Sequence, residues 1–359
     1  MKRASGQAMG MMMGQVSTLG DTPAAAGGVT VSGDVVVPEA GRRSLAAPDW
    51  RRRLQLALAG VWLLDAVLQY QSAMFARGFP QMLKASAAGN PAVVARPITW
   101  SAGIIGHHVV ALNAVFAGIQ LALGLGIAWR PTVRIALGAS IGWALAVWWL
   151  GEGLGGVLTA SASPVSGAPG PAIMYALLAV LLWPVAEGRP SPFAAGRAIG
   201  AHTARALWLI LWGSLAFFAL TPMSRAPQAV SRMISDMADG QPGWLAWADS
   251  HTASALSRHG LTASAVLAAA FIIVAVGVWL PRPAARAALI LALVVAAAMW
   301  VAEGFGGILT GSGTDPSSAP LLALLAAAYW PGRGITPSCS RPRGDNAVTG
   351  PAWLEGTAQ

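Results

Sequence analysis

Eight long apolar runs dominate the chain and limit the folds that are open to it. They cover roughly residues 54–72, 104–128, 135–151, 171–187, 204–221, 260–280, 285–302 and 319–332. About 20 apolar residues cross the hydrocarbon of a bilayer as a helix, which satisfies its own backbone polar groups there. Only 10% of the 359 residues are charged, against about a quarter in a soluble domain. The sequence therefore predicts an all-α integral membrane protein with eight transmembrane helices in the lipid bilayer.

The second half of the chain repeats motifs of the first half at an offset of 151 residues. GEGLGGVLTA at 151–160 is answered by AEGFGGILTG at 302–311, and GNP at 89–91 by GQP at 240–242. Trp149 maps in the same way to Trp300, and Ala168-Pro169 to Ala319-Pro320. Because four spans per copy is an even number, both copies must insert in the same orientation. We expect two tandem parallel four-helix repeats, at 51–188 and 204–332, joined by a linker at 189–203.

Basic residues indicate the orientation of these spans. Six of the 23 Lys and Arg residues fall in the segments that lie outside if the N-terminus is inside, which leaves 17 in the inner segments. By the positive-inside rule, both termini and the linker are cytoplasmic in the inner (plasma) membrane. We expect disordered tails at 1–50 and 333–359, and a short surface helix in each outer loop, 73–103 and 222–259. The net charge of +9 lies mostly at the ends of apolar runs, so no nucleic-acid partner is expected.

Two glutamates, Glu152 and Glu303, each end a third span and begin a glycine-rich segment. Glu152 lies 18 residues beyond Arg134, about 27 Å along a helix, which places it at the outer boundary. Its carboxylate could bind a cation, take a proton or hold a polar headgroup, or it could pair with a neighbour and fix the loop. The glycines that follow permit a tight turn or short re-entrant loop; they are Gly153, Gly155, Gly156, Gly304, Gly306 and Gly307.

Histidines recur at the same predicted depth as the glutamates. His108 and its copy His259 begin the second span of each repeat, and His107 occurs in the first copy only. A His/Glu pair could be hydrogen-bonded, relay protons or form half of a metal site. Alternatively, the histidines are interfacial and solvated by headgroups. Because two ligands per copy are too few for a metal site, no metal and no cofactor is assigned.

Asp65 lies 12 residues after Arg53 in the first span, about 18 Å along the helix. A charge at that depth is costly, so Asp65 should face the bundle interior, on the same helix face as Gln69. The second copy has only apolar residues in the matching region. The sequence therefore predicts a polar path that belongs to the first copy alone, or a protonated Asp65 that is hydrogen-bonded inside the bundle.

The second and third spans resemble the DoxX-like family of four-helix membrane proteins. The resemblance lies in AVFAGIQLALGLGIAWRPTVRIALGASIG at 114–142 and in its echo AVLAAAFIIVAVGVWLPRPAARAALIL at 265–291. It could cover about 50–187 and 204–332 as two fused units. The carboxylate common near the start of that family's second span is absent here, where Asn113 and Ser264 stand. The resemblance implies an eight-span bundle associated with quinone-linked redox chemistry or with a metal-handling partner.

Three functions fit these features. The first is a non-enzymatic protein that handles a small solute or ion through outer-face His/Glu sites. The second is the membrane subunit of a quinone-linked redox complex with a soluble or membrane partner, which predicts an apolar cleft near Asp65 and Gln69. The third is a structural scaffold, which predicts fully paired glutamates and no cavity. Phosphate-loop, dinucleotide-binding and nucleophile-elbow motifs are absent from the sequence, so nucleotide-driven pumping and serine hydrolysis are not expected. The sequence leaves enzymatic activity open and favours a non-enzymatic protein.

Overall fold

Each predicted apolar run contains a helix in the computed structural model, which describes residues 49–159, 162–185, 191–226, 228–237, 241–310 and 313–332. Of the predicted tails 1–50 and 333–359, residues 1–48 and 333–359 lie outside the described residues, and α1 begins at Trp50, inside the predicted N-terminal tail. The helices of the first half are α1 (Trp50–Leu68), α4 (Val109–Ala128), α5 (Val133–Leu150) and α6 (Pro171–Leu181). Those of the second half are α8 (Ala201–Ala219), α12 (Gly260–Gly277), α13 (Arg282–Ala302) and α14 (Ser318–Ala328). No strand occurs in these residues.

Four helices have the length and hydropathy needed to cross a bilayer. They are α4, Arg130–Leu150 (which contains α5), α12 and α13. Their outward faces carry exposed apolar side chains, among them Val115, Ile135, Val266 and Ile290. Such side chains on a helix surface suit contact with lipid rather than water. The chain is therefore an all-helical protein whose apolar helices are those of a membrane protein. α6 and α14 are shorter, with 11 residues each.

Helix starts recur at a fixed spacing along the chain. Four helices of the first half begin 151 residues before four helices of the second half, at Trp50, Gly78, Ala92 and Val109 and at Ala201, Ala229, Gly243 and Gly260. Two later pairs depart from this spacing: α5 and α13 begin at Val133 and Arg282, 149 residues apart, and α6 and α14 at Pro171 and Ser318, 147 residues apart. Counted from Glu152 and Glu303, the segment that precedes α14 is four residues shorter than the one that precedes α6.

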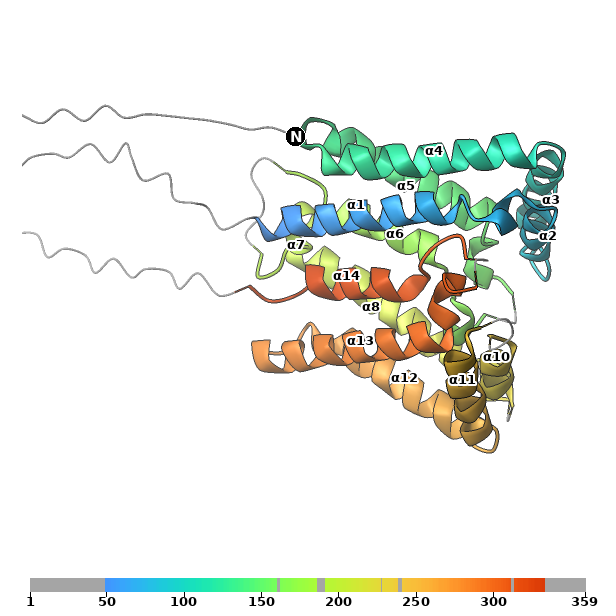
Figure 1. Ribbon diagram of the computed structural model, residues 1–359. Helices are drawn as coiled ribbons and strands as arrows, with labels where there is room; N and C mark the ends of the chain where they lie inside the picture. The colour runs from blue at the N-terminus through green and yellow to red at the C-terminus, as the bar shows by residue number, and fades with distance from the viewer. Residues whose placement is uncertain are drawn as a thin grey trace, which may run out of the picture. The chain divides into compact units, whose positions relative to one another are not determined.

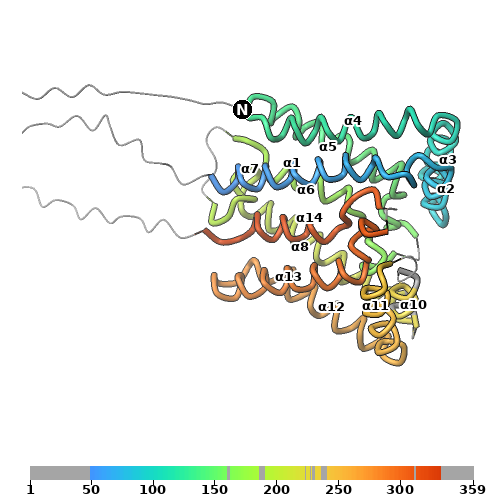
Figure 2. The backbone as a smooth tube through the Cα atoms, in the orientation of Figure 1, coloured from blue at the N-terminus to red at the C-terminus, as the bar shows by residue number. Residues whose placement is uncertain are grey.

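The helices pack in the same pattern in each half. α1 packs on α4 as α8 packs on α12, and α5 packs on α6 as α13 packs on α14. The halves meet where α14 contacts α6 and α1; Figures 1 and 2 show these helices running alongside one another. Buried aromatic side chains fill the core of the second half, including Trp208, Trp212, Phe271 and Tyr329.

Short helices lie across one end of the bundle, which we call the capped end (Figure 1). They are α2 (Gly78–Ala85), α3 (Ala92–His107), α10 (Ala229–Met237) and α11 (Gly243–Leu256). The segments 73–103 and 222–259 were each expected to form one short helix, but each contains a helix of eight or nine residues followed by one of 14 to 16 residues. Pro91 and Pro242 cap α3 and α11 at their N-termini, where a proline starts a helix but cannot continue the preceding one.

Two boundaries differ from the sequence-based expectation. α3 takes residues 104–107 of the predicted second span, and the chain bends at His108 (φ −133°, ψ 37°) before α4 begins. α8 begins at Ala201, inside the predicted linker 189–203, which also holds α7 (Gly196–Ile199). At the end opposite the capped end, the halves are joined by hydrogen bonds such as that from Trp50 Nε1 to the Ala327 carbonyl (3.1 Å).

Candidate functional site

The repeated EGxGG motif forms a left-handed turn in both halves. Gly153, Leu154, Gly155 and Gly156 all have positive φ, between 57° and 69°. Gly304, Phe305, Gly306 and Gly307 do the same, with φ between 55° and 73°. Three of the four positions are glycine because an L-residue pays about 1–2 kcal/mol for this conformation. Hydrogen bonds from Gly155 N to Glu152 O (3.0 Å) and from Gly306 N to Glu303 O (3.1 Å) close the turns.

The glycines also permit close approach of other segments. A Cβ atom on Gly153 would lie 2.3 Å from the Ser86 carbonyl oxygen, and one on Gly155 would lie 1.9 Å from that of Pro169. In the second half, a Cβ on Gly304 would lie 1.6 Å from Nε2 of Gln241. In the first half, the side-chain nitrogen of Asn90, in the GNP motif, lies beside Gly153 as that of Gln241, in the GQP motif, lies beside Gly304. The two sequence motifs that repeat along the chain therefore meet in space within each half.

Glu152 begins the first turn and points back toward α6. Its Oε1 accepts a hydrogen bond from the Ala172 N–H (3.0 Å) at the N-terminus of α6, where free N–H groups favour a negative charge. Its Oε2 is enclosed and has no hydrogen-bond partner among the described residues. Gly170 makes room for this carboxyl, because a Cβ there would lie 2.1 Å from Oε2. The turn therefore holds one buried carboxyl oxygen without a hydrogen-bond partner among the described residues.

Asp65 faces the bundle interior, as the sequence predicts, and is only 2% exposed. Its Oδ2 accepts a hydrogen bond from the Tyr175 hydroxyl of α6 (2.5 Å), and its Oδ1 has no partner among the described residues. Gln69, on the same face of α1, is also buried and exchanges hydrogen bonds with Asn113 of α4. Ser264 on α12 is the counterpart of Asn113 in the second half, and its hydroxyl donates a hydrogen bond to the Ser224 carbonyl (2.7 Å).

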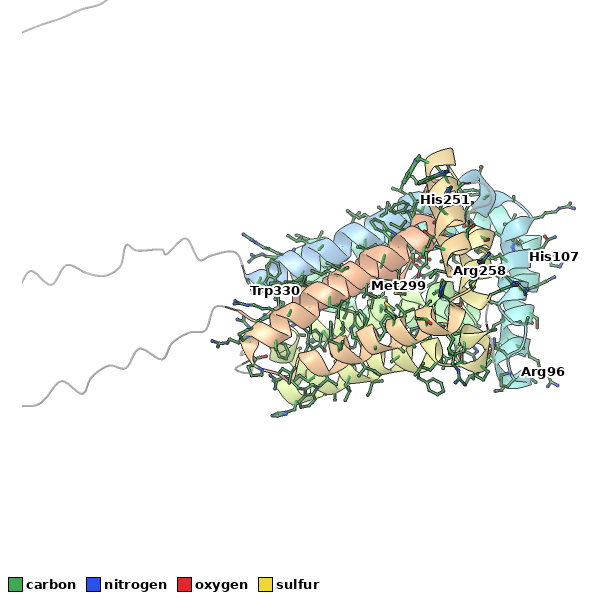
Figure 3. All side chains as sticks on the ribbon, turned by 90° about the horizontal axis from the view of Figure 1, so that it is seen from below. Arg96, His107, His251, Arg258, Met299 and Trp330 are labelled. Carbon is green, nitrogen blue, oxygen red and sulfur yellow. The ribbon has the colours of Figure 1, made fainter. Side chains whose placement is uncertain are left out.

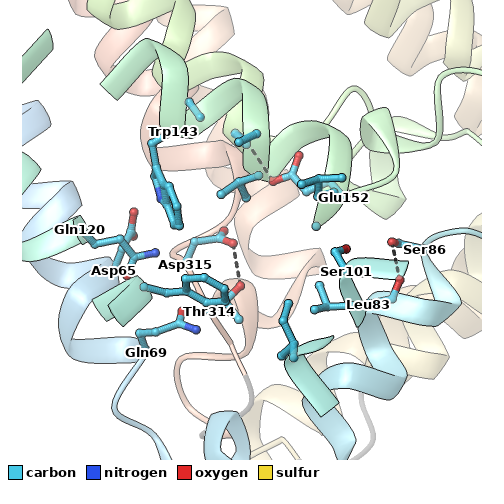
Figure 4. A pocket seen from close by; sticks show the side chains of 18 of the residues that line it. Asp65, Gln69, Leu83, Ser86, Ser101, Gln120, Trp143, Glu152, Thr314 and Asp315 are labelled. Atoms are coloured by element: carbon cyan, nitrogen blue, oxygen red, sulfur yellow. Dashed lines mark hydrogen bonds between the residues drawn. The ribbon is translucent and has the colours of Figure 1, made fainter. Parts of the chain in front are cut away.

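Asp315, which sequence reasoning missed, brings a third carboxyl to the same place from the other half of the chain. It lies in the segment 313–317 before α14, and its oxygens accept hydrogen bonds from the Ser317 N–H (2.8 Å) and the Thr314 hydroxyl (3.0 Å). Figure 4 shows Asp315 between Asp65 and Glu152. The one available signal was an acidic residue in the loop of the second copy, where the first copy has none.

These three carboxyls line a cavity of about 470 Å³ near the capped end. α1 to α6 and the segment 313–317 form its walls. Polar groups from Gln69, Gln120 and Ser101 add to the carboxyls (Figure 4). None of the described residues lining it is Lys, Arg or His. Most of the wall is apolar, and six aromatic residues contribute to it: Trp62, Phe79, Trp100, Phe116, Trp143 and Tyr175.

A smaller cavity of about 290 Å³ lies beside the first, and Glu152 lines both. Its walls come from the GNP segment, the first left-handed turn and the loop before α6, including Asn90, Gly155 and Gly170. Oδ1 of Asn90 is enclosed and lacks a hydrogen-bond partner among the described residues. The Glu152 carboxyl therefore stands at the wall shared by an apolar cavity and a more polar one.

Glu303 occupies the matching turn of the second half but does not line the large cavity. It is 9% exposed, its Oε1 lies 3.4 Å from the Ser318 hydroxyl, and its Oε2 has no partner among the described residues. Trp148 and Trp300 donate to the carbonyls of Pro169 (2.7 Å) and Pro316 (2.9 Å) in the two halves. By this hydrogen bond Trp300 is the counterpart of Trp148 rather than of Trp149, and Pro316, not Pro320, is the counterpart of Pro169. Donor and acceptor are 21 residues apart in the first half and 16 in the second.

The predicted His/Glu pairs do not form. His107, His108 and His259 are exposed at the capped end, and Figure 3 shows His107 projecting from it. His259 Nδ1 lies 3.3 Å from the carbonyl oxygen of Ala255, in the preceding helix. Within the described part of the chain, no group of three or more His, Cys, Asp or Glu residues could hold a metal ion. The bend at His108 turns its side chain to the surface, which periodicity along one helix does not predict.

Burial controls the ionisation of the loop carboxyls. It raises the pKa of Glu152 to about 8, and the charge of Asp315 adds to this rise. Burial also raises the pKa of Glu303 to about 8, although the hydrogen bond from Ser318 lowers this pKa in part. The pKa of Asp315 is raised by burial and lowered in part by its hydrogen bonds from Ser317 and Thr314. Glu152 can therefore gain or lose a proton near neutral pH.

No protein-family model, curated protein or solved structure matches the chain.

Proposed function

We propose that this protein handles a small solute or ion through the carboxyl-lined cavity, as an eight-span inner-membrane protein. The observation that carries the proposal is a large cavity with three acidic residues, two of which present an enclosed oxygen with no hydrogen-bond partner among the described residues. Isolated buried charges are expensive unless a proton or a cation neutralises them. A membrane protein that keeps such groups around an open volume has the parts of a solute site.

The membrane arrangement is two tandem parallel four-helix repeats with both termini cytoplasmic. The recurring helix starts and packing contacts support the repeat, and the distribution of Lys and Arg supports the orientation. In this arrangement the capped end is the outer face. α1 and α8 have 19 residues each, about 28 Å of helix, which is close to the hydrocarbon thickness. α6 and α14 have 11 residues each, about 16 Å of helix, so the remainder of each of these two spans consists of the segments that flank the helix.

A second candidate is the membrane subunit of a quinone-linked redox complex, the function implied by the DoxX-like resemblance. The apolar cavity beside Asp65 and Gln69 favours it, because that reading predicts such a cleft. Three carboxyls facing the cavity argue for a cationic solute instead, since a neutral quinone leaves them unpaired. The scaffold reading is less well supported, because it requires fully paired glutamates, and Oε2 of both Glu152 and Glu303 lacks a described partner.

Cysteine labelling tests the arrangement. Cys339 is the only cysteine, so Cys339→Ser gives a background without reactive thiols. In intact cells, a membrane-impermeant maleimide should label Arg96→Cys at the capped end and leave Pro131→Cys unlabelled, whereas both should react in permeabilised cells. Labelling of Pro131→Cys in intact cells would overturn the proposed orientation. Ser101→Cys, on the cavity wall, should label from outside at a lower rate than Arg96→Cys.

Transport measurements test the function. Cells expressing the wild type, Asp65→Asn or Glu152→Gln at matched membrane levels are compared for uptake and efflux of a panel of inorganic ions, organic cations and neutral solutes. We expect at least one solute whose flux depends on both carboxyls, and Glu303→Gln should leave that flux unchanged. If no solute distinguishes the wild type from either variant, the solute-handling proposal fails.

A further inference from the structure

The solute class can be argued from the charges and surfaces of the cavity. Asp65, which is 2% exposed, and Glu152 both line the cavity, and Oδ1 of Asp65 and Oε2 of Glu152 have no hydrogen-bond partner among the described residues. The described lining offers no basic side chain to compensate them. Because the wall holds no basic group, each of these carboxyls is neutralised either by a proton or by a bound cation, and an anionic ligand would add to their negative charge. The ligand that completes the site is therefore a cation.

The geometry disfavours a small inorganic ion. Such ions require several oxygens converging at about 2–2.6 Å, and no three carboxyl or imidazole groups within the described ranges are grouped closely enough. The cavity volume of about 470 Å³ also falls in the range of sites for organic ligands, about 300–1,000 Å³. The carboxyls are spread along a wall rather than gathered at one point.

The aromatic side chains indicate the rest of the ligand. Trp62, Trp100, Phe116, Trp143 and Tyr175 line the same cavity as the carboxyls. Aromatic faces carry negative potential and attract alkylammonium groups, whose weak hydration makes them easier to desolvate than small inorganic cations. They also provide apolar area for a hydrocarbon or aryl body. Carboxyls and aromatic faces around one volume therefore fit a molecule that is both cationic and apolar.

We propose that the cavity binds an organic monocation with an apolar body, such as a hydrophobic quaternary ammonium ion, and that binding displaces the proton of Glu152 to solvent. This inference rests on the proposed function and specifies its solute. The Glu152 O–H bond breaks, the proton leaves to water, and the carboxylate pairs with the bound cation. The titratable groups that face Glu152 are Asp315 from the segment 313–317 and, across the cavity, Tyr175 of α6 and Asp65 of α1.

Calorimetric titration of the purified full-length protein in lipid nanodiscs tests this inference. The probe is benzyltrimethylammonium, and its neutral isostere neopentylbenzene is the control for apolar burial alone. Binding of the cation should release one proton below pH 8. Competition with a proton at a pKa of about 8 should weaken the apparent affinity about a hundredfold from pH 9 to pH 6. Equal affinity for the cation and its isostere would overturn the inference.

Matched variants show which residues are responsible for the cation binding and for its pH dependence. Glu152→Gln should remove the pH dependence and weaken cation binding at pH 9 at least tenfold, whereas Glu303→Gln, in the same turn outside the cavity, should change neither. Trp143→Leu, on the cavity wall, should weaken cation binding more than isostere binding. If Glu152→Gln does not fold, Asp65→Asn provides the same comparison of affinities. Flux of inorganic ions that depends on Asp65 and Glu152, together with no cation binding at any pH, would overturn this inference and leave the proposed function standing.

Discussion

The hydroxyl of Tyr175 donates a hydrogen bond to Oδ2 of Asp65 across the interface between α6 and α1, with 2.5 Å between the two oxygen atoms. Both residues are almost fully buried, and the Tyr175 ring also packs against Trp62 at 4.3 Å between centroids. The contact fixes the buried carboxyl of α1 against α6, whose N-terminus receives Glu152. Two of the cavity's three acids are thus positioned by the same short helix.

Removing the Tyr175 hydroxyl should destabilise the protein. Tyr175→Phe keeps the ring contact with Trp62 but leaves Asp65 without its donor, and an unsatisfied buried polar group costs about 1–3 kcal/mol. We expect the free energy of unfolding in detergent to fall by that amount. In a double-mutant cycle with Asp65→Ala, which removes the acceptor, the two losses should add up to more than the loss in the double variant. Strict additivity would show that the hydrogen bond contributes nothing.

Replacing the first glycine of each left-handed turn by alanine should lower the stability of the protein, and the loss should be larger in the first half. Gly153→Ala and Gly304→Ala both place a Cβ on a residue with positive φ, which costs about 1–2 kcal/mol. Beyond that, the new Cβ in the first half meets the Ser86 backbone carbonyl, whereas in the second half it first meets the end of the Gln241 side chain, which can rotate. Thermal unfolding should show a larger loss for Gly153→Ala.

Gly60 is the control for these variants. It lies within α1 and nothing would lie within 4 Å of a Cβ there. Gly60→Ala should therefore stabilise the protein slightly, by up to about 1 kcal/mol, through helix propensity alone. A similar loss of stability for Gly60→Ala and Gly153→Ala would contradict the left-handed turn as the source of the cost.

The buried glutamates should make the stability depend on pH. Their folded-state pKa of about 8 lies above the unfolded value near 4.5, so the folded protein binds more protons between these pH values. Their contribution to stability is present below about pH 4.5 and is lost as pH rises through about 8. The melting temperature should fall over this window in the wild type, and the fall should be much smaller in Glu152→Gln/Glu303→Gln. An unchanged slope in the double variant would rule out these two groups as its cause.

The three exposed histidines should matter little. Alanine at His107, His108 and His259 together removes side chains that lie outside the cavity. Surface substitutions of this kind change stability by less than about 0.5 kcal/mol. We expect carboxyl-dependent solute flux in the triple variant to equal that of the wild type at matched membrane levels. A loss of flux comparable to that of Glu152→Gln would restore the predicted His/Glu site.

Local sequence pattern predicted most of the helices and the loop glycines. The apolar runs indicate α1, α4, α5, α8, α12 and α13 to within a few residues, because helix length and hydropathy are properties of contiguous residues. The EGxGG motif predicted a tight turn, since three glycines in four positions permit backbone that other residues avoid. The depth of Asp65, counted from Arg53, predicted a buried carboxyl on the face it shares with Gln69.

What the sequence alone determined, then, is what depends on near neighbours: helical segments, glycine turns and the burial of Asp65. The tertiary structure decided which acids share a cavity. Asp315 reaches the site of the first half from a loop 250 residues after Asp65, because α14 packs against both α6 and α1. The tertiary structure also decided that the histidines face outward, because the chain bends at His108 and no single helix continues through this residue. Contacts between distant segments depend on how the helices pack, and no spacing along the chain encodes them.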